Sequence, residues 1–82
     1  MDETNPAIDQ LAELEEDTNI PKNIKVKIRA IIDILKPEEE VSIKVNKALS
    51  ELDDMSNDPN LDSYTRTRMW NVVSILEKIN HH

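Results

Sequence analysis

The chain has 82 residues with no cysteine and no glycine, and its 17 acidic and 10 basic residues give a formal charge of −7. This length predicts one small domain over residues 1–82, without disulfides to support its core. The excess of carboxylates repels phosphate backbones and disfavours nucleic acid as a partner. No apolar stretch approaches the roughly 18 residues of a membrane span. Met1 is followed by acids rather than by a secretion signal, so we expect a cytoplasmic protein with no membrane partner.

Apolar residues spaced three and four positions apart predict two helices in the first half of the chain. We expect the first helix to begin at Pro6, with Asn5 as its N-cap, and to end near Glu16. The second should span about 21–36, because Pro37 moves the residue before it out of helical geometry. The wide apolar arc of this second helix predicts that it is the most buried helix.

Two further helices are predicted in the second half of the chain. The third should span about 37–56 and hold the carboxylates of residues 38–40 in its first turn, where the helix dipole favours negative charge. After a turn rich in asparagine and aspartate, a fourth helix should follow over about 62–79. The paired histidines at 81–82 are interpreted as a tail or a tag remnant, and we assign no metal to them.

The stretches 7–35 and 48–76 form two copies of one unit, offset by 41 positions. Identical residues occupy six equivalent pairs of positions: Ala7 and Ala48, Leu11 and Leu52, Asp17 and Asp58, Asn19 and Asn60, Ile34 and Ile75, and Leu35 and Leu76. The duplication predicts two antiparallel helical hairpins, at about 6–36 and 38–80, packed into an all-α four-helix bundle. A bromodomain-like bundle and a short HEAT-like pair are alternative descriptions. The predicted core consists of Ile8, Leu11, Leu14, Ile24, Ile28, Ile31, Leu35, Val45, Leu49, Leu52, Met69, Val72, Val73 and Leu76.

Charges of opposite sign gather around the turn of each hairpin. Acids end the first helix of each copy, and basic residues follow in the second: Lys22, Lys25, Lys27 and Arg29 in one copy, Arg66 and Arg68 in the other. One interpretation is that acids and bases neutralise one another between the two helices of a hairpin. The alternative is a basic face that docks an acidic or anionic partner. Its candidate binding residues are Lys22, Lys25, Arg29, Arg66 and Arg68.

Trp70 is a sixth candidate for partner binding. It occupies the position of Arg29 in the first copy, away from the core stripe of its helix. A large aromatic side chain at such a position either seals the edge of the bundle or anchors a partner. Tyr64 is the only other member of the Phe, Tyr and Trp group, so a stacking surface for single-stranded nucleic acid is poorly supported.

Residues suited to catalysis are scarce in this sequence. It has no cysteine nucleophile, no glycine-rich phosphate loop, no histidine outside the tail and no Ser-His-Asp set that could be assembled. We therefore expect no enzyme activity and no cofactor. A carboxylate-based, metal-dependent hydrolase using Asp53, Asp54 and Asp58 is kept as an alternative, because sequence alone does not show where these side chains point.

Three stretches resemble one known family: DTNIPKNI at 17–24, LDDMSNDPNL at 52–61 and TRTRMWNVVS at 65–74. Over about residues 8–77 the chain resembles the archaeal uncharacterised protein family 0147. This resemblance implies a small, acidic, all-helical protein with a four-helix bundle-like fold, and the family name declares no known activity. Asp62 departs from the proline that members of the family often have at this position.

The functional hypothesis is a non-catalytic module for protein–protein interaction, with an unidentified protein partner. Self-association into a homo-oligomer is part of this hypothesis, because the core of so short a chain is marginal. The competing hypothesis is an adaptor on RNA or ribosomal surfaces, which would use the local basic face and lose affinity steeply with salt.

Overall fold

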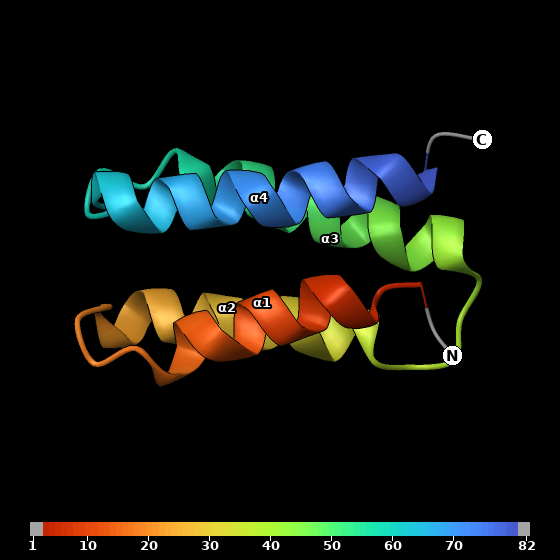
Figure 1. Ribbon diagram of the computed structural model, residues 1–82, viewed down its shortest axis with the longest axis horizontal. Coiled ribbons are helices and arrows are strands. Elements are labelled where there is room, and N and C mark those ends of the chain that lie inside the picture. Colours follow the sequence, from red (N-terminus) through yellow and green to blue (C-terminus); the bar gives the residue numbers. More distant parts are fainter. Residues whose placement is uncertain (1–2, 81–82) are drawn as a thin grey trace.

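The computed structural model describes residues 3–80, which form four α-helices and no β-strand. The helices are α1 (Asn5–Glu16), α2 (Lys22–Leu35), α3 (Val41–Ser56) and α4 (Ser63–Asn80). Successive helices run in opposite directions, so that α1 with α2 and α3 with α4 form antiparallel hairpins (Figure 1). The predicted all-α four-helix bundle is confirmed. None of these helices has both the length and the apolar character needed to cross a membrane.

The helices are arranged in a ring around one core. α1 packs against α2 and α4, and α3 packs against the same two helices, whereas α1 with α3 and α2 with α4 lie across the diagonals. Side chains from every helix and from both hairpin turns fill the centre. The buried core consists of Ala7, Leu11, Leu14, Ile20, Ile24, Ile28, Ile31, Ile32, Leu35, Val45, Ala48, Leu52, Met55, Leu61, Met69, Val72 and Leu76.

Most of the predicted core is buried, with three exceptions. Ile8, Leu49 and Val73 are only partly buried, because they lie at the margins of the helix contacts. Two turn residues that were not predicted, Ile20 and Leu61, are buried at 5% and 6% exposure. Helical spacing assigns no face to a residue in a turn, which is why the sequence pattern missed them. As predicted, α2 contributes more buried aliphatic side chains than any other described helix.

The two hairpin turns have the same structure. The Asn19 N–H donates to Asp17 Oδ1 and the Asn60 N–H donates to Asp58 Oδ1, both at 2.9 Å. The backbone carbonyls of these two aspartates accept hydrogen bonds from the residue three positions later, at 3.3 and 3.1 Å. Aspartate forms such turns readily because its short side chain reaches the backbone two residues on. The duplication in the sequence is therefore a duplication of backbone geometry.

α3 begins later than the sequence pattern predicted. It starts at Val41, so residues 38–40 lie before the helix and not in its first turn. The connection between the hairpins bends at Pro37, whose carbonyl accepts hydrogen bonds from the Glu39 N–H at 2.9 Å and from Lys44 Nζ at 3.1 Å. Because the Pro37 carbonyl accepts these bonds, the connection does not form the backbone hydrogen bonds of an α-helix before Val41. The predicted interaction of three carboxylates within the first turn is thus wrong.

The starts of α1 and α4 also differ from expectation. Asn5 is the first residue of α1 and not its cap, because the N-cap is the buried Thr4, whose carbonyl accepts a hydrogen bond from the Ile8 N–H at 3.0 Å. At α4, the Thr65 N–H donates to Asp62 Oδ1 at 2.8 Å. An aspartate that accepts this bond satisfies one of the free N–H groups of a helix start. Asp62 therefore caps the start of α4.

Two aspartates that precede α4 have pKa values below the ordinary value in the folded state. The pKa of Asp58 is lowered from 3.8, mainly by the hydrogen bond from the Asn60 N–H and further by Lys27. The pKa of Asp62 is lowered from 3.8 by hydrogen bonds from the side chain and the backbone N–H of Thr65. A pKa that is lower in the folded state means that the unfolded chain binds more protons in acid. The stabilisation is present at pH values well above 3.8 and is lost progressively as the pH falls through the lower pKa values of the folded state.

We expect urea denaturation to show this loss between about pH 5 and pH 2. In the double variant Asp58→Asn with Asp62→Asn, each side chain keeps an Oδ1 atom that accepts the backbone hydrogen bond, but neither side chain titrates. The free energy of unfolding of this variant should therefore depend less on pH. The matched variant Asp9→Asn with Asp54→Asn removes two exposed carboxylates and should follow the natural chain. Parallel pH profiles for the two double variants would contradict the assignment.

Candidate partner-binding grooves

The six candidate binding residues lie on two helices that do not pack against each other. Lys22, Lys25 and Arg29 belong to α2, and Arg66, Arg68 and Trp70 belong to α4. Because α2 and α4 occupy one diagonal of the ring, the structure does not gather these residues into one basic surface. The exposed Lys22 and the half-buried Arg66 make no ion pair within residues 3–80. The other four lie in two separate grooves and in one contact between the hairpins.

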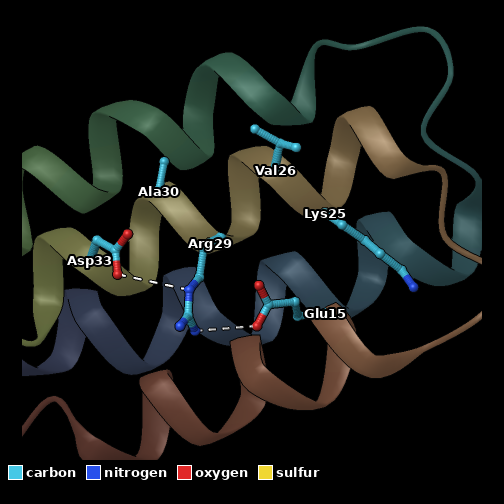
Figure 2. A pocket seen from close by; sticks show the side chains of 6 residues that line it. All are labelled: Glu15, Lys25, Val26, Arg29, Ala30 and Asp33. Carbon is cyan, nitrogen blue, oxygen red and sulfur yellow. Dashed lines mark hydrogen bonds and ion pairs between the residues drawn. The ribbon is translucent and has the colours of Figure 1, made fainter.

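A groove of about 500 Å³ runs along the outward face of α2 beside α1. Its lining residues are Glu15, Lys25, Val26, Arg29, Ala30 and Asp33. Figure 2 shows the Arg29 guanidinium between two carboxylates, with Nη1 3.4 Å from Glu15 Oε1 and Nε 3.9 Å from Asp33 Oδ1. Lys25 adds a second cation, so that two positive and two negative side chains line this groove. The α1–α2 groove therefore carries no net charge.

Arg68 forms a contact between the two hairpins. Its Nη2 donates to Glu13 Oε2 at 2.8 Å and to Gln10 Oε1 at 3.0 Å, both on α1. Its Nη1 donates to the hydroxyl of Tyr64 at 3.1 Å, and the guanidinium carbon lies 5.9 Å from the centre of that ring. The hydrogen bond to Glu13 raises the pKa of Arg68 above its ordinary value. This guanidinium is engaged in holding α4 against α1.

Lys27 is the equivalent of Arg68 in the first copy, and it also reaches the other hairpin. Its Nζ lies 3.3 Å from Asp58 Oδ2. The predicted neutralisation within a hairpin is correct for Arg29 and Glu15 but wrong for Lys27 and Arg68. The reason is tertiary: α1 packs on α4 and α2 packs on α3, which places the second helix of each hairpin beside the other hairpin.

A second groove, of about 210 Å³, lies between α3 and α4. Its lining residues are Leu49, Leu52, Asp53, Ser56, Met69, Trp70, Val73 and Glu77. Trp70 is 57% exposed, so it does not seal the edge of the bundle, which was one of its two predicted roles. Within residues 3–80 its indole N–H has no hydrogen-bond acceptor. The indole is thus available to a partner through its face and its N–H.

The linings of the two grooves have two pairs of equivalent positions in common. A shift of 41 positions converts Glu15 into Ser56 and Arg29 into Trp70, and each pair lines its own groove. An ion pair spans the first groove. In the second, the Ser56 hydroxyl donates to the backbone carbonyl of Asp53 at 2.8 Å and does not bridge to α4. At these two positions the α3–α4 groove has a serine and an exposed aromatic ring, whereas the α1–α2 groove has an ion pair.

The proposed hydrolase carboxylates do not converge. Asp53 lines the α3–α4 groove, Asp54 is exposed, and Asp58 is engaged in the second hairpin turn. In the part of the chain that the structure describes, no group of three or more His, Cys, Asp or Glu side chains could hold a metal ion. His81 and His82 lie outside the described residues.

Two features of the surface and core were not identified from sequence. Lys44 is only 1% exposed, although lysine is rarely buried, and no local pattern predicts this. Asp53 and Glu77 both line the α3–α4 groove beside Trp70. A signal existed for Glu77, because a residue seven positions after Trp70 lies on the same side of a helix.

The chain matches the model of the Uncharacterised protein family (UPF0147) over residues 2–79. It belongs to this family. The UPF0147 proteins of Methanosarcina mazei and Methanocaldococcus jannaschii are 41% and 40% identical to it over 70 residues, which cover 84% of this chain and 75% of each relative. A UPF0147 protein of Metallosphaera sedula is 40% identical over 74 residues, covering 89% and 83%. The family predicted from three short stretches is confirmed.

A solved structure agrees with the bundle seen in this UPF0147 protein. The crystal structure of MMP1188, a protein of unknown function, is similar to it with a TM-score of 0.85 at 36% identity. The similarity covers 92% of this chain and 86% of that one. The UPF0147 family is uncharacterised in function, so the role of the two grooves is argued from their chemistry.

Proposed function

We propose that this UPF0147 protein is a non-catalytic module for protein–protein interaction, and that the α3–α4 groove around Trp70 is its binding surface. The single observation that carries the proposal is a tryptophan that is 57% exposed in a groove lined mainly by apolar residues. Tryptophan is enriched among the residues that dominate binding energies, because its ring removes a large apolar area from water when a partner covers it.

The dimensions of the groove favour a protein partner. At about 210 Å³ it is smaller than the roughly 300–1,000 Å³ of typical small-molecule sites. A groove of this size receives one or two side chains of a partner more readily than a cofactor. The carboxylates of the hydrolase alternative lie apart, which also supports a binding role.

The RNA-adaptor hypothesis has weaker support. Arg29 and Arg68 are both committed to carboxylates, and the chain as a whole carries a charge of −7. A protein that binds phosphate backbones uses free cations on one face, and its affinity falls as salt rises. Binding of mixed RNA that weakened steeply with salt would favour the adaptor over the proposed function.

The proposal predicts that Trp70→Ala removes a specific partner. We expect affinity capture from the native cell, followed by quantitative mass spectrometry, to recover at least one protein whose yield falls by about tenfold or more with this variant. Tyr64→Ala is the matched control, since Tyr64 is an aromatic residue of α4 with a similar exposure of 54%. Circular dichroism should show that both variants keep the helical fold.

Capture that is equal for the natural chain and Trp70→Ala would contradict the proposal. The homo-oligomer part of the hypothesis is tested separately by light scattering after size exclusion. A mass that remained at 9.5 kDa at high protein concentration would remove self-association and leave binding to another protein.

A further inference from the structure

The α3–α4 groove has unbalanced negative charge. Asp53 and Glu77 are the only charged side chains among its lining residues. Neither carboxylate forms an ion pair or accepts a hydrogen bond within residues 3–80. The α1–α2 groove differs, because two cations offset its two carboxylates. Only the groove with the exposed tryptophan therefore combines an aromatic face with uncompensated acids.

We propose that the occupant of this groove is a basic segment of a partner protein, and that one of its arginine side chains stacks on Trp70 between Asp53 and Glu77. This inference rests on the proposed function and names the chemistry of the partner. The guanidinium group stacks on aromatic faces and donates hydrogen bonds to carboxylates in a planar geometry, which fits both features of the groove. The aliphatic stem of the arginine would cover Leu49 and Val73, which are only partly buried.

Charge complementarity distinguishes this occupant from a second copy of the chain. A two-fold symmetric contact through the groove would bring Asp53 and Glu77 of both copies into one interface without a cation among the residues that line it. Like charges in such a position oppose association. If this groove contacted the α1–α2 groove of another copy, the contact would gain little electrostatic attraction, because the α1–α2 groove has no net charge.

The test uses a short synthetic amphipathic helix with leucines on one face and flanking arginines. Trp70 is the only tryptophan of the chain, so its fluorescence and its indole N–H resonance report binding at this site alone. We expect both signals to respond to the arginine peptide. A matched peptide with citrulline in place of every arginine keeps the shape without the charge and should bind about tenfold more weakly or worse. Added salt should weaken the arginine complex.

Variants of the protein separate the groove from its general acidity. Asp53→Asn with Glu77→Gln should weaken the arginine peptide by about tenfold. Asp9→Asn with Glu51→Gln removes the same charge from exposed positions outside the groove and should change affinity by less than about twofold. Equal weakening by both double variants, equal binding of the citrulline peptide, or no response of Trp70 would each overturn the inference.

Failure of the basic-occupant inference can be distinguished experimentally from failure of the proposed interaction function. A captured partner that depends on Trp70 but tolerates Asp53→Asn with Glu77→Gln would retain the interaction module and reject the basic occupant. A dimer that dissociates with Trp70→Ala would assign the groove to a second copy and also overturn the inference. Capture that is unaffected by Trp70→Ala would remove both proposals together.

Discussion

Leu52→Ala is expected to lower the free energy of unfolding by about 2–5 kcal/mol. Leu52 is 1% exposed and belongs to the single buried cluster of the bundle. Alanine would remove apolar contacts and leave a cavity that the surrounding helices fill only in part. A domain of this size has a total stability of roughly 4–12 kcal/mol, so the loss is a large fraction of the whole. Urea denaturation followed by circular dichroism measures it.

The equivalent position in the first copy gives a second measurement. Leu11 is 0% exposed, and Leu11→Ala should fall in the same range as Leu52→Ala. Val26→Ala is the matched surface control, because Val26 is 69% exposed, and it should change stability by less than about 0.5 kcal/mol. A change below about 1 kcal/mol for Leu52→Ala would show that the two hairpins do not share this core.

Lys44→Glu is expected to have an effect of similar size, about 3–5 kcal/mol, for an electrostatic reason. The Lys44 side chain is 1% exposed and its Nζ donates to the Pro37 carbonyl at 3.1 Å. A glutamate at this position would place a buried anion near a carbonyl oxygen, where neither group donates a hydrogen bond. Thermal unfolding at neutral pH should show a much lower Tm than that of the natural chain.

Two variants isolate the role of the buried charge. Lys44→Met keeps most of the aliphatic stem and loses the hydrogen bond to Pro37, so a cost near 1 kcal/mol is expected. Lys47→Glu makes the same charge change on the same helix, but Lys47 is 57% exposed and its ion pair with Glu39 lies on the surface. Its cost should be about 1 kcal/mol or less. Equal Tm values for Lys44→Glu and Lys47→Glu would place the Lys44 side chain in solvent.

The two copies keep similar turns and core positions but differ at the surface where function is proposed. The turns keep the same hydrogen bonds, and Leu11 and Leu52 keep the same burial. The grooves, by contrast, differ at one equivalent position, where Arg29 forms an ion pair in the first copy and Trp70 is exposed in the second. A duplicated hairpin retains what its core requires, while its outer grooves are free to differ because surface ion pairs contribute little to stability.

The fold was largely predictable because its signals are local. Helical spacing, the asparagine and aspartate turns and the offset of 41 positions are all present in the sequence, and each describes contacts within about one hairpin. The helix starts were less accurate. The late start of α3 depends on Pro37 and its bond from Lys44, which a pattern of apolar residues does not contain.

The sequence by itself determined the four helices, their pairing into hairpins and most of the positions that face the core, because hydrophobic periodicity and turn chemistry act over a few residues. Only the tertiary structure decided that Arg68 and Lys27 each form an ion pair with a residue of the other hairpin. The burial of Lys44, and the groove that Asp53 of α3 and Trp70 of α4 line together, were also decided at this level. These contacts depend on which helices become neighbours in the ring, and that choice is made by the packing of the whole core.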